Sequence, residues 1–366
     1  AFPRFIANPT YEWVNGAWSV LTQYPMSDLK PERTKSWEVG MNFRFLTDLT
    51  FDATWYLADT YNQTFNPNLA VGKYSNLYVQ AGNVRNWGME FALNYEHTWG
   101  NFTWSSGLTY SFNKNKIREL ARNVINPVTG ETFSLDQIEP AAGNSLGATH
   151  FILREGGTMG DLYSSVDLMR DANGNIYVDN TGAVSKTTIK DNSEYIKLGS
   201  VLPKGNLAWS NTFRWKNLSA SCMFSARLGG IVFSRTQAIL DLYGVSEASG
   251  AARDLGYVSI NGGDHVNPEQ WYGTIASGDM VPQYYTYSAT NVRLQEATIS
   301  YLIPRRLLAN VCDIRVSLVG RNLWMIYNKA PFDPEAVASA GNYYQGMDNF
   351  MMPSLRNFGF NVNFNF

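Results

Sequence analysis

Histidine is the side chain best suited to acid–base or metal chemistry at neutral pH. The chain has three, His97, His150 and His265, and they lie far apart in the sequence. None belongs to an HExxH pair or a similar metal-ligand spacing, and the sequence contains no CxxC, GxSxG or Walker A motif. Asp333 and Glu335 form a carboxylate pair without a recognisable base or nucleophile beside them. The sequence therefore indicates neither an enzyme nor a cofactor or metal site.

Two glycine-containing segments have the composition of ligand loops. Residues 156–160 read GGTMG, but they follow no predicted strand and lack the lysine of a phosphate-binding loop, so we interpret them as a flexible connection. Residues 171–175 read DANGN and are followed by Asp179, which faintly resembles a calcium loop. The glycine comes two positions too early for that loop. A hairpin turn at Asn173 and Gly174 is the preferred interpretation, and bound calcium is left open.

Aromatic residues outside the predicted strands are the candidate ligand contacts. Amphipathic rings with a hydrogen-bonding tip suit a sugar or peptide surface. The alternative is that they pack the loops against each other or against a partner protein. The candidates are Tyr163, Tyr177, Trp271, Tyr272, Tyr284, Tyr285, Tyr343 and Tyr344.

The composition of the 366 residues narrows the class of protein. Hydrophobic residues make up 45% and aromatic residues 14%, whereas only 16% are charged, which is the reverse of a disordered chain. The 29 basic and 31 acidic residues give a net charge of −2, so we expect no binding of nucleic acid by bulk charge. No apolar run approaches the roughly 18 residues of a spanning helix. Cys222 and Cys312 are too few for a disulfide framework, and both fall on the apolar phase of strand-like segments.

Strict alternation of apolar and polar residues dominates the chain and predicts β-strands. In the seventh strand, Val292 and Leu294 lie on the opposite phase from Ala297 and Ile299, which predicts a β-bulge between them. The predicted strands are residues 36–45, 49–57, 87–96, 102–112, 207–215, 218–228, 292–303, 312–318 and 358–366.

Short and long connections alternate along the chain. The short ones lie near residues 47–48, 99–101, 216–217 and 304–310, and the long ones near 59–84, 114–205, 229–290 and 323–354. Bacterial outer-membrane barrels have short periplasmic turns and long extracellular loops. Tryptophans near the strand ends and a polar alternate phase suit aromatic girdles and a wetted interior. The sequence therefore predicts an all-β transmembrane antiparallel barrel, with a soluble β-sandwich as the alternative.

Nine strands are an odd number, whereas single-chain bacterial barrels are even and cannot expose a sheet edge to lipid. Residues 1–35 look irregular, as a long loop with at most one strand end. We therefore expect residues 1–366 to be the C-terminal part of a larger barrel, contributing about nine or ten strands.

Several segments resemble SusC-like TonB-dependent transporters when they are taken together and in order. LKPERT at residues 29–34 runs into the first alternating strand, and NWGME at 86–90 begins the third. The others are EGG at 155–157, GDLY at 160–163, residues 171–182, RLGG at 227–230, RNL at 321–323, DPE at 333–335 and the terminal FGFNVNFNF.

This resemblance implies a 22-stranded barrel in the outer membrane of a Gram-negative bacterium. Such proteins carry a plug domain, absent from this sequence, and import glycans or oligopeptides with energy from the TonB complex. The resemblance further implies a SusD-like lipoprotein partner, contact with outer-membrane lipid, and a C-terminal signal for the barrel-assembly machinery. That signal would be Phe358, Phe360, Val362, Phe364 and Phe366. A passive porin or a structural or adhesin barrel is the alternative function, and a barrel enzyme would need converging catalytic groups.

Overall fold

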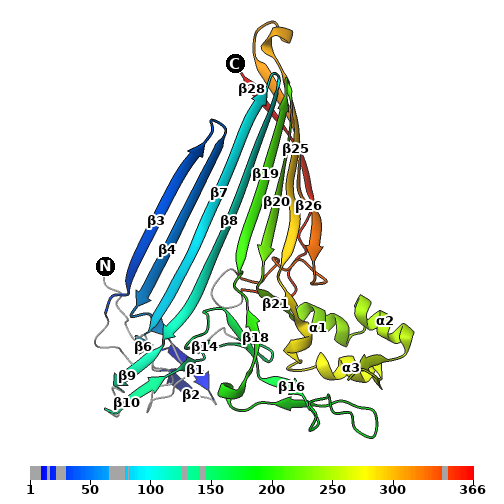
Figure 1. Ribbon diagram of the computed structural model, residues 1–366. Helices are drawn as coiled ribbons and strands as arrows, with labels where there is room; N and C mark the ends of the chain where they lie inside the picture. Colours follow the sequence, from blue (N-terminus) through cyan, green and yellow to red (C-terminus); the bar gives the residue numbers. More distant parts are fainter. Residues whose placement is uncertain are drawn as a thin grey trace.

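A computed structural model describes residues 10–14, 17–21, 30–65, 79–80, 82–125, 130–140, 145–339 and 345–366. Its dominant feature is one nine-stranded sheet in which every neighbouring pair is antiparallel and strands follow one another in chain order (Figure 1). All nine predicted strands are confirmed. They are β3 (Arg33–Phe45), β4 (Leu49–Tyr61), β7 (Asn83–Trp99), β8 (Phe102–Glu119), β19 (Gly205–Trp215), β20 (Leu218–Leu228), β25 (Asn291–Ile303), β26 (Asp313–Asn328) and β28 (Asn357–Asn365).

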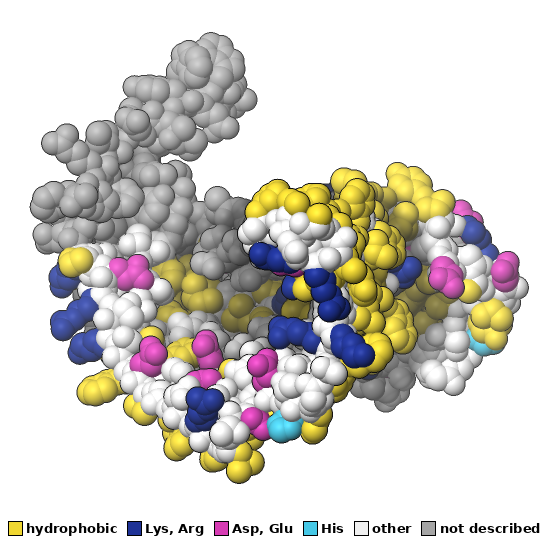
Figure 2. Space-filling model, turned by 90° about the horizontal axis from the view of Figure 1, so that it is seen from above, with side chains coloured by type: hydrophobic (Ala, Val, Ile, Leu, Met, Phe, Trp, Pro, Cys, Tyr) yellow, Lys and Arg dark blue, Asp and Glu magenta, His cyan; other side chains and the backbone are white. Residues whose placement is uncertain are grey.

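The register places the apolar phase of every strand on one face, which we call the outer face. Phe43 of β3 lies opposite Phe51 of β4, which lies opposite Leu93 of β7. The inner face carries the polar phase, because successive side chains of a strand point to opposite sides. Seen from the end with the short turns, hydrophobic side chains gather along the outer rim of the curved sheet (Figure 2).

The four short connections lie together at one end of the sheet and the long ones at the other (Figure 1). The predicted bulge is confirmed by a register shift between Leu294 and Glu296. β8 continues to Glu119, well beyond its predicted end. The prediction that Cys312 lies inside a strand was wrong, because Cys312 lies just before β26, in the connection that contains η3 (Arg305–Leu307), where it is buried.

The long connections fold into a packed layer, which we call the loop layer and define as residues 120–125, 130–140, 145–204, 229–290, 329–339 and 345–356. Its core includes Phe151, Phe233, Trp271, Tyr285 and Met347. Three helices belong to it, α1 (Arg235–Leu242), α2 (Glu247–Leu255) and α3 (Pro268–Ile275), with Ser234, Ser246 and Asn267 as their N-caps. Apolar residues within the connections therefore build a second core outside the sheet.

Short strands and turns complete the loop layer and its surroundings. They are β5 (Thr64–Phe65), β6 (Val79–Gln80), β9 (Ala121–Ile125), β10 (Thr132–Leu135), β11 (Gln137–Ile138), β12 (Ser145–Leu146), β13 (Thr149–Phe151), β14 (Leu153–Arg154), β15 (Asp161–Ser164), β16 (Val166–Leu168), β17 (Lys186–Thr188), η1 (Asn192–Glu194), β18 (Ile196–Ser200), β21 (Ile231–Ser234), β22 (Val258–Ile260), β23 (Asp264–Val266), η2 (Pro282–Tyr285), β24 (Thr286–Ser288) and β27 (Met347–Asp348).

The N-terminal region is more regular than predicted. β1 (Thr10–Val14) pairs with β2 (Ala17–Leu21) as an antiparallel hairpin, so the expectation of an irregular segment was wrong there. The expected strand end is Arg33, where β3 begins. Within the described residues, no helix combines the length and the apolar character needed to cross a bilayer.

Candidate functional site

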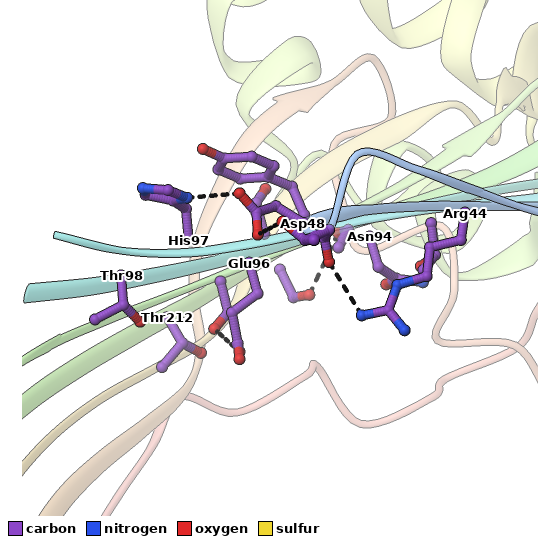
Figure 3. A pocket seen from close by; sticks show the side chains of 14 residues that line it. Arg44, Asp48, Asn94, Glu96, His97, Thr98 and Thr212 are labelled. Carbon is purple, nitrogen blue, oxygen red and sulfur yellow. Dashed lines mark hydrogen bonds and ion pairs between the residues drawn. The ribbon is translucent and has the colours of Figure 1, made fainter.

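The inner face ends, beside the short turns, in a polar pocket of about 700 Å³ (Figure 3). Its lining comes from the turn between β3 and β4 and from β7, β8 and β19, which the antiparallel register brings together. Residues of the inner face that line it include Arg44, Asn94, Glu96, Ser105 and Thr212. Hydroxyl, amide and ionic groups therefore lie side by side at this end of the sheet.

Hydrogen bonds fix the turn beside this pocket. Arg44 donates from Nη2 to the carbonyl oxygen of Thr47 over 3.1 Å. The Thr47 hydroxyl donates to Asp48 Oδ1 over 2.9 Å, and Asp48 Oδ2 lies 2.6 Å from His97 Nδ1. The His97 hydrogen bond, followed by that of Thr47, lowers the pKa of Asp48. This network holds the β3–β4 turn against the end of β7.

The His97–Asp48 pair does not form a nucleophilic site with the nearby hydroxyl. Ser105 donates to Glu96 on the inner face, whereas His97 belongs to the opposite phase of β7. Figure 3 shows the imidazole pointing away from Glu96 and Thr212. His97 instead packs 4.4 Å from the ring of Trp99 on the outer face. The structure therefore gives this histidine a positioning contact with the β3–β4 turn.

The structure does bring together a carboxylate, a histidine and a serine in the loop layer, which the sequence did not reveal. His150 Nδ1 lies 2.7 Å from Glu139 Oε1, and its Nε2 lies 3.1 Å from Ser165 Oγ. Ser165 is buried and its hydroxyl also donates to the carbonyl oxygen of Ala148 over 3.3 Å. These contacts tie neighbouring loop strands together. Ser165 lines none of the three cavities of about 700, 1120 and 440 Å³.

The candidate calcium loop at residues 171–175 is held by hydrogen bonds of its own. Asp171 accepts backbone N–H groups of Asn173 and Asn175, at 2.8 and 2.9 Å, and these bonds, led by that of Asn175, lower the pKa of its carboxyl group. Gly174 adopts φ of +84° and Arg170 pairs with Ile176, which confirms the hairpin turn. Among the described residues, no group of three His, Cys, Asp or Glu is placed to hold a metal ion.

Asp333 and Glu335 find their partner in Arg293, which sequence analysis missed. The guanidinium of Arg293 lies 2.8 Å from Asp333 and 3.1 Å from Glu335. Arg293 projects from the inner face of β25 at the end that meets the loop layer. Nothing in the sequence indicated this ion pair, because Arg293 and Asp333 are 40 residues apart and Arg293 looks like any polar residue of an alternating strand.

Most of the candidate loop aromatics pack within the loop layer. Trp271 and Tyr285 are in its core, and Tyr272 and Tyr284 pack against that core. Burial, reinforced by the nearby Asp241 carboxylate, raises the pKa of the Tyr285 hydroxyl. This is the arrangement that the packing alternative describes, and the ligand-binding role of these four rings stays a prediction.

The other candidate aromatics differ in their surroundings. Tyr163 is buried beneath the Arg154 guanidinium, 4.4 Å from its ring centre, whereas Tyr177 is exposed. Tyr343 and Tyr344 lie outside the described residues. The structure therefore leaves Tyr177 as the candidate that is open to a ligand within the described part of the chain, and its role too stays a prediction.

The proposed assembly signal lies on the edge strand β28. Phe358, Phe360, Val362 and Phe364 are opposite Gly320, Leu318, Val316 and Ile314 of β26, so they share the outer face. Phe366 follows the strand and is exposed. This placement presents an apolar stripe at the end of the sheet, and recognition by assembly machinery stays a prediction.

Comparison with known proteins agrees with this architecture. Residues 5–199 match the family model described as TonB dependent receptor-like, beta-barrel. TonB-dependent receptor P3 of Formosa agariphila is 27% identical over 96% of this chain and 36% of its own length. TonB-dependent receptor SusC of Bacteroides thetaiotaomicron is 24% identical over 82% of this chain and 29% of its own length. The chain thus spans about a third of these relatives.

A solved structure shows the same fold. The RagAB peptide importer in its closed-closed state matches with a TM-score of 0.66 and 16% identity. The match covers 98% of this chain and 38% of that one. The sheet and much of the loop layer therefore have a counterpart within a chain more than twice as long.

Proposed function

Because this chain belongs to the TonB dependent receptor-like β-barrel family, whose members are outer-membrane proteins of Gram-negative bacteria, we propose that it is the C-terminal part of an active importer. In this proposal a 22-stranded barrel takes up a large nutrient, a glycan or an oligopeptide. Transport is energised by the TonB complex, and a SusD-like surface lipoprotein delivers the ligand to the loop layer. Residues 1–366 supply barrel strands and extracellular loops, and the plug lies in another part of the protein.

The observation that carries the proposal is the continuous polar lining of the inner face. Thr54, Glu90, Ser111 and Asn206 form one row across four strands near the loop layer. Closer to the short turns, Glu96, Ser105, Thr212, Ser221 and Thr298 form another across five strands. Neutral hydroxyl and amide groups predominate in these rows, which suits sugars and peptide backbones better than a strongly charged solute.

The relatives support the same proposal for the whole protein. SusC and P3 are named as TonB-dependent receptors, and RagAB is described as a peptide importer. Among the described residues no strand pairs with the outer edge of β3 or of β28, which also supports further strands, because an unpaired edge is unfavourable in lipid. A passive porin or an adhesin barrel would use the same outer face but would not need energy coupling.

Uptake by cells tests active import directly. A strain lacking the complete gene, and the same strain with the gene restored, would be given fluorescent oligosaccharides or oligopeptides. We expect saturable uptake that requires the gene and stops when a protonophore removes the proton-motive force. Uptake that continues with the protonophore would establish the passive pore instead. A gene-dependent adhesion phenotype without uptake of either class would establish the structural barrel.

A further inference from the structure

The outer face has a sharp boundary where apolar side chains give way to cations. Along β7, the outer residues run from Trp99 near the short turns to Trp87 near the loop layer. Those thirteen residues extend about 40 Å along the strand, which is about 28 Å across a bilayer for a strand tilted by about 45°. Because this matches a hydrocarbon core, Trp87 marks the extracellular boundary of the membrane and Trp99 the opposite one.

Three cations follow immediately beyond that boundary on β8. Lys114 lies opposite Trp87, with its Nζ 5.0 Å from the centre of the indole ring. Lys116 and Arg118 are the next residues on the same phase, at intervals of about 7 Å. We call Lys114, Lys116 and Arg118 the basic ladder. All three are exposed.

The basic ladder forms no ion pair within the described chain, although the Asp59 carboxylate interacts with Arg118 through charge alone. Arg85, beside Lys116, is paired with Asp59 at 2.6 Å. No such ion pair involves Lys114, Lys116 or Arg118 among the residues that the structure describes. An unpaired row of cations at this level of a membrane protein attracts anionic lipid headgroups.

Two cavities flank the basic ladder and share Trp87 and Lys116. One, of about 440 Å³, lies over β4, β7 and β8 and is lined by Trp55, Leu57, Arg85, Trp87, Lys116 and Arg118. The other, of about 1120 Å³, lies where β8 meets the loop layer, and its lining adds Lys114, Lys204 and Tyr287. Each cavity combines cations with aromatic or aliphatic side chains. Such a surface can contact both the phosphate groups of a lipid headgroup and the first part of its acyl chains.

We propose that the basic ladder binds the phosphate groups of lipid A, the phosphorylated glycolipid of the outer leaflet. The cations lie at headgroup depth, none of them forms an ion pair with a described residue, and the tryptophans below them face the acyl chains. Lipid phosphates match this surface in charge and position. The inference depends on the outer face contacting lipid and does not depend on transport, so it holds for an importer or a passive barrel.

Native mass spectrometry of the complete protein in mild detergent, titrated with bisphosphorylated lipid A, tests this site. The variant K114Q/K116Q/R118Q removes the charge and keeps side chains of similar polarity. Each cation near an anionic lipid surface contributes about fivefold to binding, so the triple variant should bind about 100-fold more weakly. Lys216→Gln is the matched control, because its Nζ lies 5.3 Å from the ring of Trp215 at the opposite membrane boundary. The control should bind as the wild type does.

Two further arms identify the ligand. Lipid A stripped of both phosphates should bind as weakly to the wild type as lipid A binds to the triple variant, and millimolar inorganic phosphate should not displace lipid A. Heat-modifiable migration on gels confirms that each variant is folded. Equal binding by folded wild type and triple variant, equal binding of the dephosphorylated lipid, or displacement by free phosphate would each overturn the proposal.

Discussion

Arg293 and Asp333 form a two-point ion pair that fastens the segment after β26 to the inner face of β25. Arg293 donates from Nη1 to Asp333 Oδ2 over 3.0 Å and from Nη2 to Asp333 Oδ1 over 2.8 Å. The two side chains are only 6% and 8% exposed. Asn291 accepts from the same guanidinium at Nε and Nη2, so the buried charge is enclosed by partners. The pair connects the barrel strands to the loop layer.

Replacing Arg293 should destabilise the protein strongly. Arg293→Met leaves the Asp333 carboxylate buried without its cation, which costs about 3–5 kcal/mol. Chemical unfolding of the complete protein in bilayers measures the free energy. Arg321→Met is the control, because Arg321 of β26 pairs with Glu296 of β25 but is 67% exposed, and its loss should cost less than about 1 kcal/mol. Similar losses in both variants would contradict the assignment of a buried pair.

The same pair predicts a loss of order in acid. Burial raises the pKa of Asp333, but hydrogen bonds from Arg293, Ser354 and the backbone of Glu335 outweigh it and hold the pKa below its usual value. A carboxyl group whose pKa is lower in the folded state than in the unfolded state stabilises the fold at pH values above its unfolded-state pKa, about 3.9. That stabilisation is lost as the pH falls through the folded-state pKa. The protection of residues 329–335 from hydrogen exchange, taken relative to the intrinsic exchange rate at each pH, should therefore stay constant from pH 7 to 5 and fall below about pH 4. Unchanged protection in acid would contradict this account.

Charge substitutions on the two faces of the sheet should have unequal costs. Phe91→Arg places a charge on the outer face near mid-bilayer depth and should cost roughly 2–4 kcal/mol. Phe213→Arg lies on the same face but only two residues from Trp215 at the membrane boundary, so its cost should be smaller. The same charge at Asn94 or Thr212 lies on the inner face and should be tolerated. Unfolding in lipid bilayers compares the four variants. Equal losses of unfolding free energy for outer-face and inner-face variants would show that the outer and inner faces have been assigned wrongly.

The C-terminal residue should matter for assembly. Phe366 ends the apolar stripe of β28 and is exposed, so a recognition role should be lost in Phe366→Ser without loss of core packing. Asn365→Ser, one position earlier on the inner phase, is the control. Heat-modifiable barrel in isolated outer membranes should fall several-fold for Phe366→Ser alone. Wild-type levels in that variant would count against an assembly signal.

The strands could be predicted from the sequence because alternation is local. A row such as Trp37, Val39, Met41 and Phe43 fixes which side of the strand is apolar, whatever its neighbours are. Even the bulge near Leu294 left a local trace, since it shifted the phase. The outer end of β8 was missed because the outer phase changes there from Phe112 to Lys114 and Lys116, and the apolar signal stops before the strand does.

The loop layer and its contacts could not be predicted in the same way. Glu139, His150 and Ser165 meet where the short strand β13 pairs with β15, and no periodicity in the sequence records that pairing. Trp271 and Tyr285 belong to a core assembled from three separate connections, so their burial depends on tertiary packing. An aromatic side chain such as Trp271 or Tyr285 can contact a ligand or pack in a core, so its residue type alone did not distinguish the two roles.

The mass and composition of the native complex test the central claim most directly. The complex would be extracted in mild detergent from outer membranes and analysed by native mass spectrometry. A polypeptide between two and three times 41.1 kDa, containing this sequence at its C-terminal end and accompanied by a surface lipoprotein, is the predicted result. A polypeptide of 41.1 kDa without further barrel strands or a partner would contradict the importer proposed here.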